Sequence, residues 1–356
     1  MKIDEMIQYL RNYAKPLKIM EVCGTHTTAI AKSGLRELIS PSIRLVSGPG
    51  CPVCITPSSY IDVLTAYARE KNHTVLSFGD LFKVRGTGES LSDVKAAGAD
   101  VRMIYSPLET LTLAREHPER LYILAAVGFE TTMPLYAVLV EELVRNGVGN
   151  VRLLTSLKTM LPALDYVCEN ETVDAFLCPG HVSVVLGSGA YGALCRKYQK
   201  PFVIAGFEPE HILCAIYRIV RQIEKQRPRV ENLYTSVVSA EGQPEAQRLV
   251  SRYFTLSNAF WRGIGELKGS GMLLKEAFAR FDLGSGDIAP DVPARGCRCG
   301  DVMLGRISPG QCGLFAAGCT PANPQGACMV SSEGACAVWY AAERGRLNGW
   351  ENMTEQ

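Results

Sequence analysis

The 356-residue sequence lacks the features that mark membrane and nucleic-acid-binding proteins. No apolar run approaches the ~18 residues that a membrane-spanning helix needs. The N-terminal segment carries Asp4 and Glu5 and lacks the basic and apolar regions of a signal peptide. The net charge of +1 gives no reason to expect nucleic acid or an anionic membrane as a partner. We therefore predict a cytoplasmic protein that binds neither.

Two common catalytic motifs are also missing. The sequence has no GxxxxGK[ST] phosphate-binding loop and no HExxH metalloprotease motif. The nearest approach to a nucleotide loop, Gly86-Thr87-Gly88, has none of the other residues of such a fingerprint. Nothing in the sequence therefore predicts ATP binding.

Cysteine, in contrast, is abundant, with 13 residues. A reducing cytoplasm argues against a disulfide framework, so a cysteine cluster predicts metal or redox chemistry. Three cysteines lie near the start of the chain, at Cys23, Cys51 and Cys54. Six more crowd into the C-terminal segment: Cys297, Cys299, Cys312, Cys319, Cys328 and Cys336.

Up to about residue 210, the sequence alternates short apolar runs with segments of helical periodicity. This alternation predicts parallel βαβ units and an α/β fold. Eight strands are expected, which fall by sequence order into two sets of four. They are residues 18–22, 43–46, 74–78, 101–105, 122–127, 151–155, 175–177 and 202–205. The clearest helices are residues 58–69, 135–145 and 210–225.

The alternation fades after a polar stretch at residues 224–232, and residues 284–334 show little periodicity. Such a segment needs something other than an apolar core to order it, and a metal cluster would serve.

Potentially reactive side chains follow six of the eight predicted strands, each beside a glycine. Ligands of open parallel sheets bind at the carboxyl ends of the strands, so a shared crevice is predicted, although each glycine could simply mark a turn. The candidates are Cys23, His26, Cys51, Cys54, Asp80, Glu130, His181 and Glu208.

Cys23 and His26 could form a nucleophile and its base, or two ligands of a soft metal. A position at a helix N-terminus would lower the pKa of the Cys23 thiol. The alternative is a buried inert thiol beside a core histidine. Cys51 and Cys54 form a CxxC unit, which is either a redox dithiol or half of a zinc site. The redox interpretation is favoured because no second cysteine pair lies nearby.

The six C-terminal thiols could hold a [4Fe–4S] cluster or a zinc ion with four cysteine ligands. Their spacing matches neither ferredoxin pattern. Two thiols remain after either metal takes four, which suits a cluster beside a dithiol better than a simple zinc site.

Five motifs together resemble the HypD family of hydrogenase maturation factors. They are CGTHT at residues 23–27, SGPGCPVC at 47–54, GFETT at 128–132, PGHVS at 179–183 and MVSSEGAC at 329–336. The resemblance implies two related Rossmann-like domains with small parallel sheets and a third α/β domain that carries an iron–sulfur cluster. The expected domains are residues 17–106, 107–223 and 224–356, with residues 1–16 as a candidate to pack on the third.

The resemblance also implies a function. Such a protein is a redox-active scaffold rather than a conventional turnover enzyme. With the small chaperone HypC it holds an iron that receives two cyanides and one carbon monoxide. Cyanide arrives through HypE, and the finished unit goes on to the hydrogenase large subunit.

The resemblance assigns roles to named residues. Cys23 is the iron-side thiol, with Cys51 and Cys54 as a redox pair near it. The [4Fe–4S] ligands are Cys297, Cys312, Cys319 and Cys336, and Cys299 and Cys328 are the spare redox pair. His26, Asp80, Glu130, His181 and Glu208 are expected to line the crevice as hydrogen-bonding or proton-transfer groups. The rival hypotheses are a cluster-dependent protein disulfide reductase and a zinc-stabilised adaptor.

Overall fold

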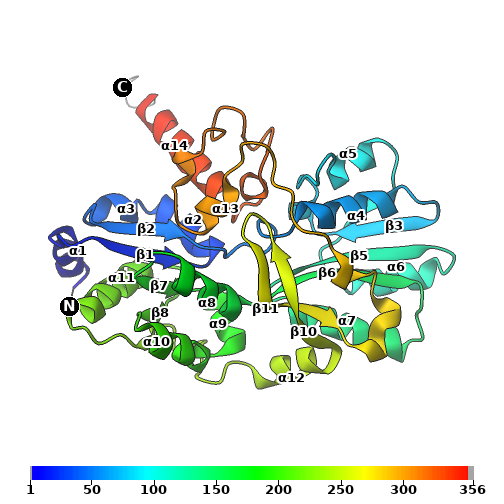
Figure 1. The fold of residues 1–356 in the computed structure, drawn as a ribbon, viewed down its shortest axis with the longest axis horizontal. Coiled ribbons are helices and arrows are strands. Elements are labelled where there is room, and N and C mark those ends of the chain that lie inside the picture. Colours follow the sequence, from blue (N-terminus) through cyan, green and yellow to red (C-terminus); the bar gives the residue numbers. More distant parts are fainter. Residues whose placement is uncertain (1, 352–356) are drawn as a thin grey trace. The chain divides into compact units, whose positions relative to one another are not determined.

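The computed structural model describes residues 2–351, and their side chains as far as residue 343. The chain forms two compact units, each built around one sheet (Figure 1). Unit 1 contains Met1–Cys51, Leu164–Gly242 and Gly296–Gln356. Unit 2 contains Pro52–Ala163 and Gln243–Arg295.

Unit 1 has a five-stranded parallel sheet in the order β2-β1-β7-β8-β9. Its strands are β1 (Leu17–Glu21), β2 (Ile43–Ser47), β7 (Ala175–Cys178), β8 (Phe202–Ile204) and β9 (Val230–Asn232). One core joins the first four of these strands to α1 (Ile3–Arg11), α2 (Gly24–Lys32), α3 (Leu35–Leu38) and α11 (Pro209–Glu224). The unit also contains α9 (Gly180–Leu186) and α10 (Gly192–Tyr198), and α8 (Met160–Asn170) spans the boundary between the units. The sequence of α11 favours a helix because its apolar residues are spaced to share one face. Ile212, Ile216 and Ile219 lie on that face and are buried.

Unit 2 has a six-stranded sheet in the order β10-β11-β6-β5-β3-β4. Its strands are β3 (His73–Ser77), β4 (Val101–Met103), β5 (Leu121–Gly128), β6 (Val151–Lys158), β10 (Phe254–Trp261) and β11 (Gly265–Leu274). The first four strands are parallel, and the β10–β11 hairpin adds antiparallel to β6. The helices are α4 (Ser58–Ala68), α5 (Leu91–Ala96), α6 (Glu109–Glu116), α7 (Met133–Arg145) and α12 (Pro244–Tyr253).

The structure confirms the eight predicted strands, the three predicted helices and the α/β class. Three further strands, β9, β10 and β11, were not predicted. β9 lies inside the polar stretch that was expected to be a linker, and β11 contains three glycines. Their residues lack the apolar runs that identify buried strands, because β9 and β10 are edge strands and most residues of β10 are exposed or half-buried.

The grouping of strands differs from the predicted one. β1 and β2 pair with β7 and β8, whereas β3 and β4 pair with β5 and β6. The predicted boundaries at residues 106 and 223 therefore fall inside the units, and the predicted third domain is divided between them after Gly242 and again after Arg295. Apolar runs reveal that strands exist, but parallel partners are joined by long crossovers that leave no pairing signal in the sequence.

Residues 1–16 belong with the first sheet rather than with a third domain. Leu10 and Tyr13 share a core with Ile19 and Ile216. Residues 1 and 352–356, which fall within the predicted domains, lie outside the described residues.

The C-terminal segment has little regular structure, as predicted. It consists mainly of short turns around α13 (Cys299–Met303) and ends in α14 (Ala335–Glu351). No helix in the described part of the chain combines the length and apolar composition needed to cross a membrane.

Candidate functional site

Cys23 stands between the end of β1 and the start of α2, as the N-cap residue of that helix. Its thiol is 7% exposed and lies near the backbone N–H groups of Thr25 and His26. The predicted position at a helix N-terminus is therefore confirmed. The predicted low pKa is wrong: burial raises the pKa of Cys23 to about 11, and the N–H groups only partly offset it. A thiolate here needs a cation to compensate the lost hydration.

The loop that follows β2 lies directly against Cys23. A methyl group on Gly50 would come 2.5 Å from the carbonyl carbon of Val22 and 2.6 Å from the backbone nitrogen of Cys23. Only glycine permits so close an approach of two backbones. The next residue, Cys51, is buried and disulfide-bonded, as is Cys54. The CxxC unit is thus oxidised in this structure. Its redox role stays a prediction.

Glu21 was not among the predicted site residues. It connects the Cys23 loop, the segment between β1 and the start of α2, to the sheet through hydrogen bonds. Its carboxylate is 2% exposed and accepts hydrogen bonds from the hydroxyls of Thr27 at 2.8 Å and Ser47 at 2.7 Å. Burial raises the pKa of Glu21 to about 7. An acidic residue at the end of a mostly apolar strand, followed by a hydroxyl at Thr27, is the signal that could have identified it.

His26 is buried at the start of α2, and its role as a base or a metal ligand stays a prediction. Its Nε2 lies 3.1 Å from the carbonyl oxygen of Gly206, which assigns the ring proton to Nε2, and its Nδ1 has no hydrogen-bond partner among the described residues. Burial lowers the pKa of His26 to about 4, so the ring is neutral. Phe207 contacts the rings of both His26 and His181, with centroids 4.8 Å and 4.3 Å apart.

The remaining members of the predicted crevice are divided between the two sheets. His181 and Glu208 belong to unit 1 and are exposed at the ends of β7 and β8. Asp80 and Glu130 follow β3 and β5 of unit 2. The strand-end placement was therefore predicted correctly, but the carboxyl ends belong to two sheets, because the chain enters a second sheet after β2.

Glu130 is buried, and only one of its two carboxylate oxygens accepts a hydrogen bond from another residue that the structure describes. Its Oε1 accepts the Met160 N–H at 2.7 Å, whereas its Oε2 has no hydrogen-bond partner within the described residues. Burial raises the pKa of Glu130 to about 7. The native state therefore binds a proton between about pH 4.5 and 7 that the unfolded chain has already released.

This predicts how stability depends on pH. The contribution of Glu130 is fully present below pH ~4.5 and is lost as the pH rises through 7, because the buried carboxylate must then ionise. Glu130→Gln keeps the bond to Met160 and cannot ionise. We expect it to raise the free energy of unfolding by up to about 3 kcal/mol at pH 8 and to change it little at pH 4.5. Denaturant unfolding at both pH values checks this, and an equal effect at both would contradict it.

Four of the six C-terminal thiols lie together. Cys328 Sγ is 3.1 Å from Cys336 Sγ and is also hydrogen-bonded to Cys299, with Cys297 close by. The hydrogen bond from Cys299 lowers the pKa of Cys328, but the bond to Cys336 and burial outweigh it, so this pKa stands well above its usual range.

Cys312 and Cys319 belong to a neighbouring turn. Main-chain hydrogen bonds join Phe315 to Cys312 and Cys319 to Leu314, and Cys319 Sγ accepts the Gln325 N–H at 3.3 Å. Among the side chains that the structure describes, as far as residue 343, no group of three or more histidine, cysteine or acidic residues is arranged to hold a metal ion. Six thiols within one poorly periodic segment nevertheless fit the donor chemistry of an iron–sulfur cluster.

The cysteine-rich segment packs against the Cys23 loop. A methyl group on Gly24 would lie 2.3 Å from Glu333 Cβ and 2.6 Å from its carbonyl oxygen. The Thr25 hydroxyl also donates to Glu333 Oε1 at 3.2 Å. Glu333 lies between Cys328 and Cys336 in sequence, so the thiol cluster and Cys23 are held by adjoining loops. Sequence spacing provided no indication of this contact.

The chain is similar to known proteins over nearly its whole length. The family described as "HypD: Hydrogenase formation hypA family" matches residues 1–343. "Hydrogenase maturation factor HypD" of Azotobacter vinelandii is 40% identical over 341 residues, covering 92% of this chain and 90% of that protein. The protein of the same name from Escherichia coli is 39% identical over 355 residues, covering 95% of each chain. The "Putative hydrogenase expression/formation protein MJ0993" of Methanocaldococcus jannaschii is 36% identical over 347 residues, with 96% and 97% covered.

Proposed function

Since the chain belongs to the HypD family, we propose that it acts in hydrogenase maturation, as the scaffold on which an iron atom receives two cyanides and one carbon monoxide. The observation that carries this proposal is the meeting of three cysteine-bearing segments in unit 1. Gly50, which precedes Cys51, lies on the backbone of Cys23, and Glu333, which precedes Cys336, lies on Gly24.

Cys23 is the residue we assign to the iron. Low-spin iron with strong-field diatomic ligands takes soft thiolate ligation, and exclusion of water protects it. Cys23 offers a buried thiol in a pre-formed loop, and the N–H groups of Thr25 and His26 are placed to stabilise a thiolate. Burial makes the free thiol hard to ionise, so the thiolate is formed when a cation binds.

The C-terminal thiols are proposed to hold a [4Fe–4S] cluster, which supplies one-electron chemistry when bound. We assign the ligands to Cys297, Cys312, Cys319 and Cys336. Cys299 and Cys328 then form the spare dithiol. The two thiols are hydrogen-bonded to each other, and Cys328 is also bonded to the proposed ligand Cys336. Cys51 and Cys54 form a second dithiol, next in sequence to the loop that lies on Cys23.

A second chain is expected to complete the iron site. Once Cys51 and Cys54 are bonded to each other, Cys23 is the thiol left here for iron. Gly206 holds Nε2 of His26, so Nδ1 is the one atom of that ring left as a ligand. HypC is the proposed partner that supplies a further ligand. HypE is the proposed source of cyanide, and the hydrogenase large subunit is the proposed recipient.

The cluster assignment predicts a composition. Protein purified anaerobically should be brown and contain about four irons and four acid-labile sulfides per chain. Cys312→Ala or Cys319→Ala should remove most of both, because each deletes a proposed ligand. Cys214→Ala, which changes a half-buried cysteine on α11, should leave both unchanged. Stoichiometric zinc without sulfide would instead support the zinc-stabilised adaptor.

A protein disulfide reductase is the competing function, favoured by the bonded CxxC unit. It needs the cluster and the dithiol but gives Cys23 no role. Infrared spectroscopy of protein purified anaerobically with HypC separates the two functions, because only the scaffold carries cyanide and carbon monoxide.

A further inference from the structure

Lys158 is a buried lysine without a counterion among the described residues. It is the last residue of β6, and its side chain is only 5% exposed. No hydrogen bond or ion pair involves its amino group within the part of the chain that the structure describes. A buried ammonium group is costly unless an anion accompanies it. Consistent with this, burial lowers the pKa of Lys158 to about 7.

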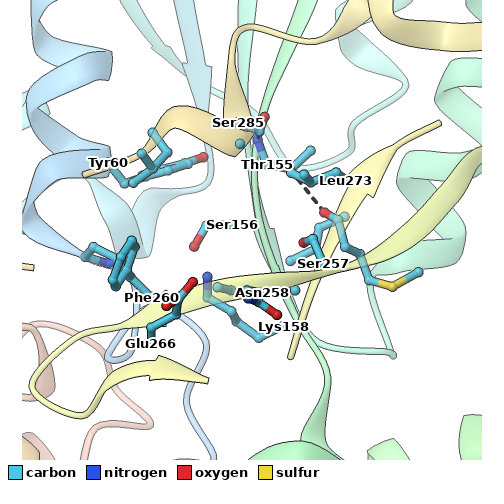
Figure 2. Close-up of a pocket in the computed structure, with 17 residues that line it drawn as sticks. Tyr60, Thr155, Ser156, Lys158, Ser257, Asn258, Phe260, Glu266, Leu273 and Ser285 are labelled. Atoms are coloured by element: carbon cyan, nitrogen blue, oxygen red, sulfur yellow. Dashed lines mark hydrogen bonds between the residues drawn. The ribbon is translucent and has the colours of Figure 1, made fainter. Parts of the chain in front are cut away.

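The Lys158 side chain lines a cavity that belongs entirely to unit 2. The cavity has a volume of about 270 Å³ and lies between the end of β6, the β10–β11 hairpin, the start of α4 and the turn at Ser285–Asp287. Figure 2 shows the Lys158 amino group among the side chains of Ser156, Asn258 and Glu266. A space of this size holds a ligand of a few heavy atoms or several waters.

Three of the hydroxyl groups around the cavity are already engaged as donors. Thr155 donates to the Met272 carbonyl, Ser285 to Asp282, and Tyr60 to the Leu154 carbonyl. Asn258 accepts the Gly269 N–H. The hydroxyl of Ser257 and the amide group of Asn258 are neutral donors, so the cationic amino group of Lys158 is the strongest donor in the cavity that is not committed to a protein acceptor.

The position of the cavity matches a general rule for such sheets. Ligands of open parallel sheets bind at the carboxyl ends of the strands, and Lys158 ends the parallel strand β6. Glu266 is the one carboxylate among the described lining residues, and it is exposed and forms no ion pair with Lys158. The positive charge of the Lys158 ammonium group could therefore be balanced by an anion from outside the chain.

We propose that this cavity binds a small oxyanion, a carboxylate or a phosphate, through the amino group of Lys158. The site belongs to unit 2, has no cysteine among its described lining residues and does not depend on the proposed scaffold function. The oxyanion would supply the negative charge that the protein does not provide and would accept up to three hydrogen bonds from the ammonium group.

Calorimetric titration of the full chain with acetate and with inorganic phosphate, at slightly acidic pH, tests the proposal. We expect saturable binding of at least one of the two probes, and the one that binds identifies the class. Lys158→Met should weaken it by at least about tenfold, because a charge-assisted hydrogen bond is lost. Lys268→Met, which removes an exposed lysine from the same hairpin, should leave the affinity unchanged.

A second measurement uses the unaltered protein, in case Lys158→Met fails to fold. Reductive methylation followed by peptide mapping should modify Lys158 more slowly when the bound probe is present, while Lys268 reacts at the same rate with and without it. Absence of binding by both probes would overturn the proposal. Equal affinity in Lys158→Met, or no protection of Lys158, would do so as well.

Discussion

Cys23→Ser is expected to abolish the cyanide and carbon monoxide infrared bands of the protein purified anaerobically with HypC. A serine hydroxyl is a hard and weakly acidic ligand, and it does not replace a thiolate on low-spin iron. The loss should be essentially complete, because Cys23 is the one thiol of its loop.

The fold should survive this change. The N–H groups of Thr25 and His26 can bond a hydroxyl as they bond the thiol, and serine is a favoured N-cap residue. Iron and sulfide in the C-terminal segment should therefore stay at the wild-type level. Cys214→Ser provides the matched control and should keep the bands. Bands of normal intensity in Cys23→Ser would mean that another residue holds the iron.

Gly24→Ala is expected to destabilise the protein by more than about 2 kcal/mol, against the direction that helix propensity predicts. Gly24 is the first residue of α2, and alanine normally stabilises a helix by about 1 kcal/mol relative to glycine. Here the added methyl group would lie 2.3 Å from Glu333 Cβ and 2.6 Å from the Glu333 carbonyl oxygen. Overpacking against backbone typically costs about 1–3 kcal/mol, and it must displace the segment that bears Glu333.

Denaturant unfolding measures the loss of stability, and limited proteolysis locates it. We expect new cleavage between Cys297 and Cys336 in Gly24→Ala, together with reduced iron content. Gly149→Ala is the matched control, because Gly149 is exposed and an added methyl group would meet no described atom within 4 Å. Unchanged stability in Gly24→Ala would show that the cysteine-rich segment does not rest on the Cys23 loop.

The sequence alone determined the fold class and the placement of most candidate residues. Periodicity located eight strands because buried parallel strands are continuous apolar runs. The glycines beside Cys23, His181 and Glu208 marked strand ends because the chain turns there. The family was also evident from the motifs, since their residues and order are specific.

Tertiary structure alone decided how these parts combine. It divided the strands between two sheets in an order that the sequence does not reveal, because long crossovers separate parallel partners. It also determined the protonation state of the Cys23 thiol. A helix N-terminus favours a thiolate at Cys23, but burial outweighs it, and burial depends on residues far away in sequence. The contact between Gly24 and Glu333 and the isolation of Lys158 arise in the same way, from packing between distant segments.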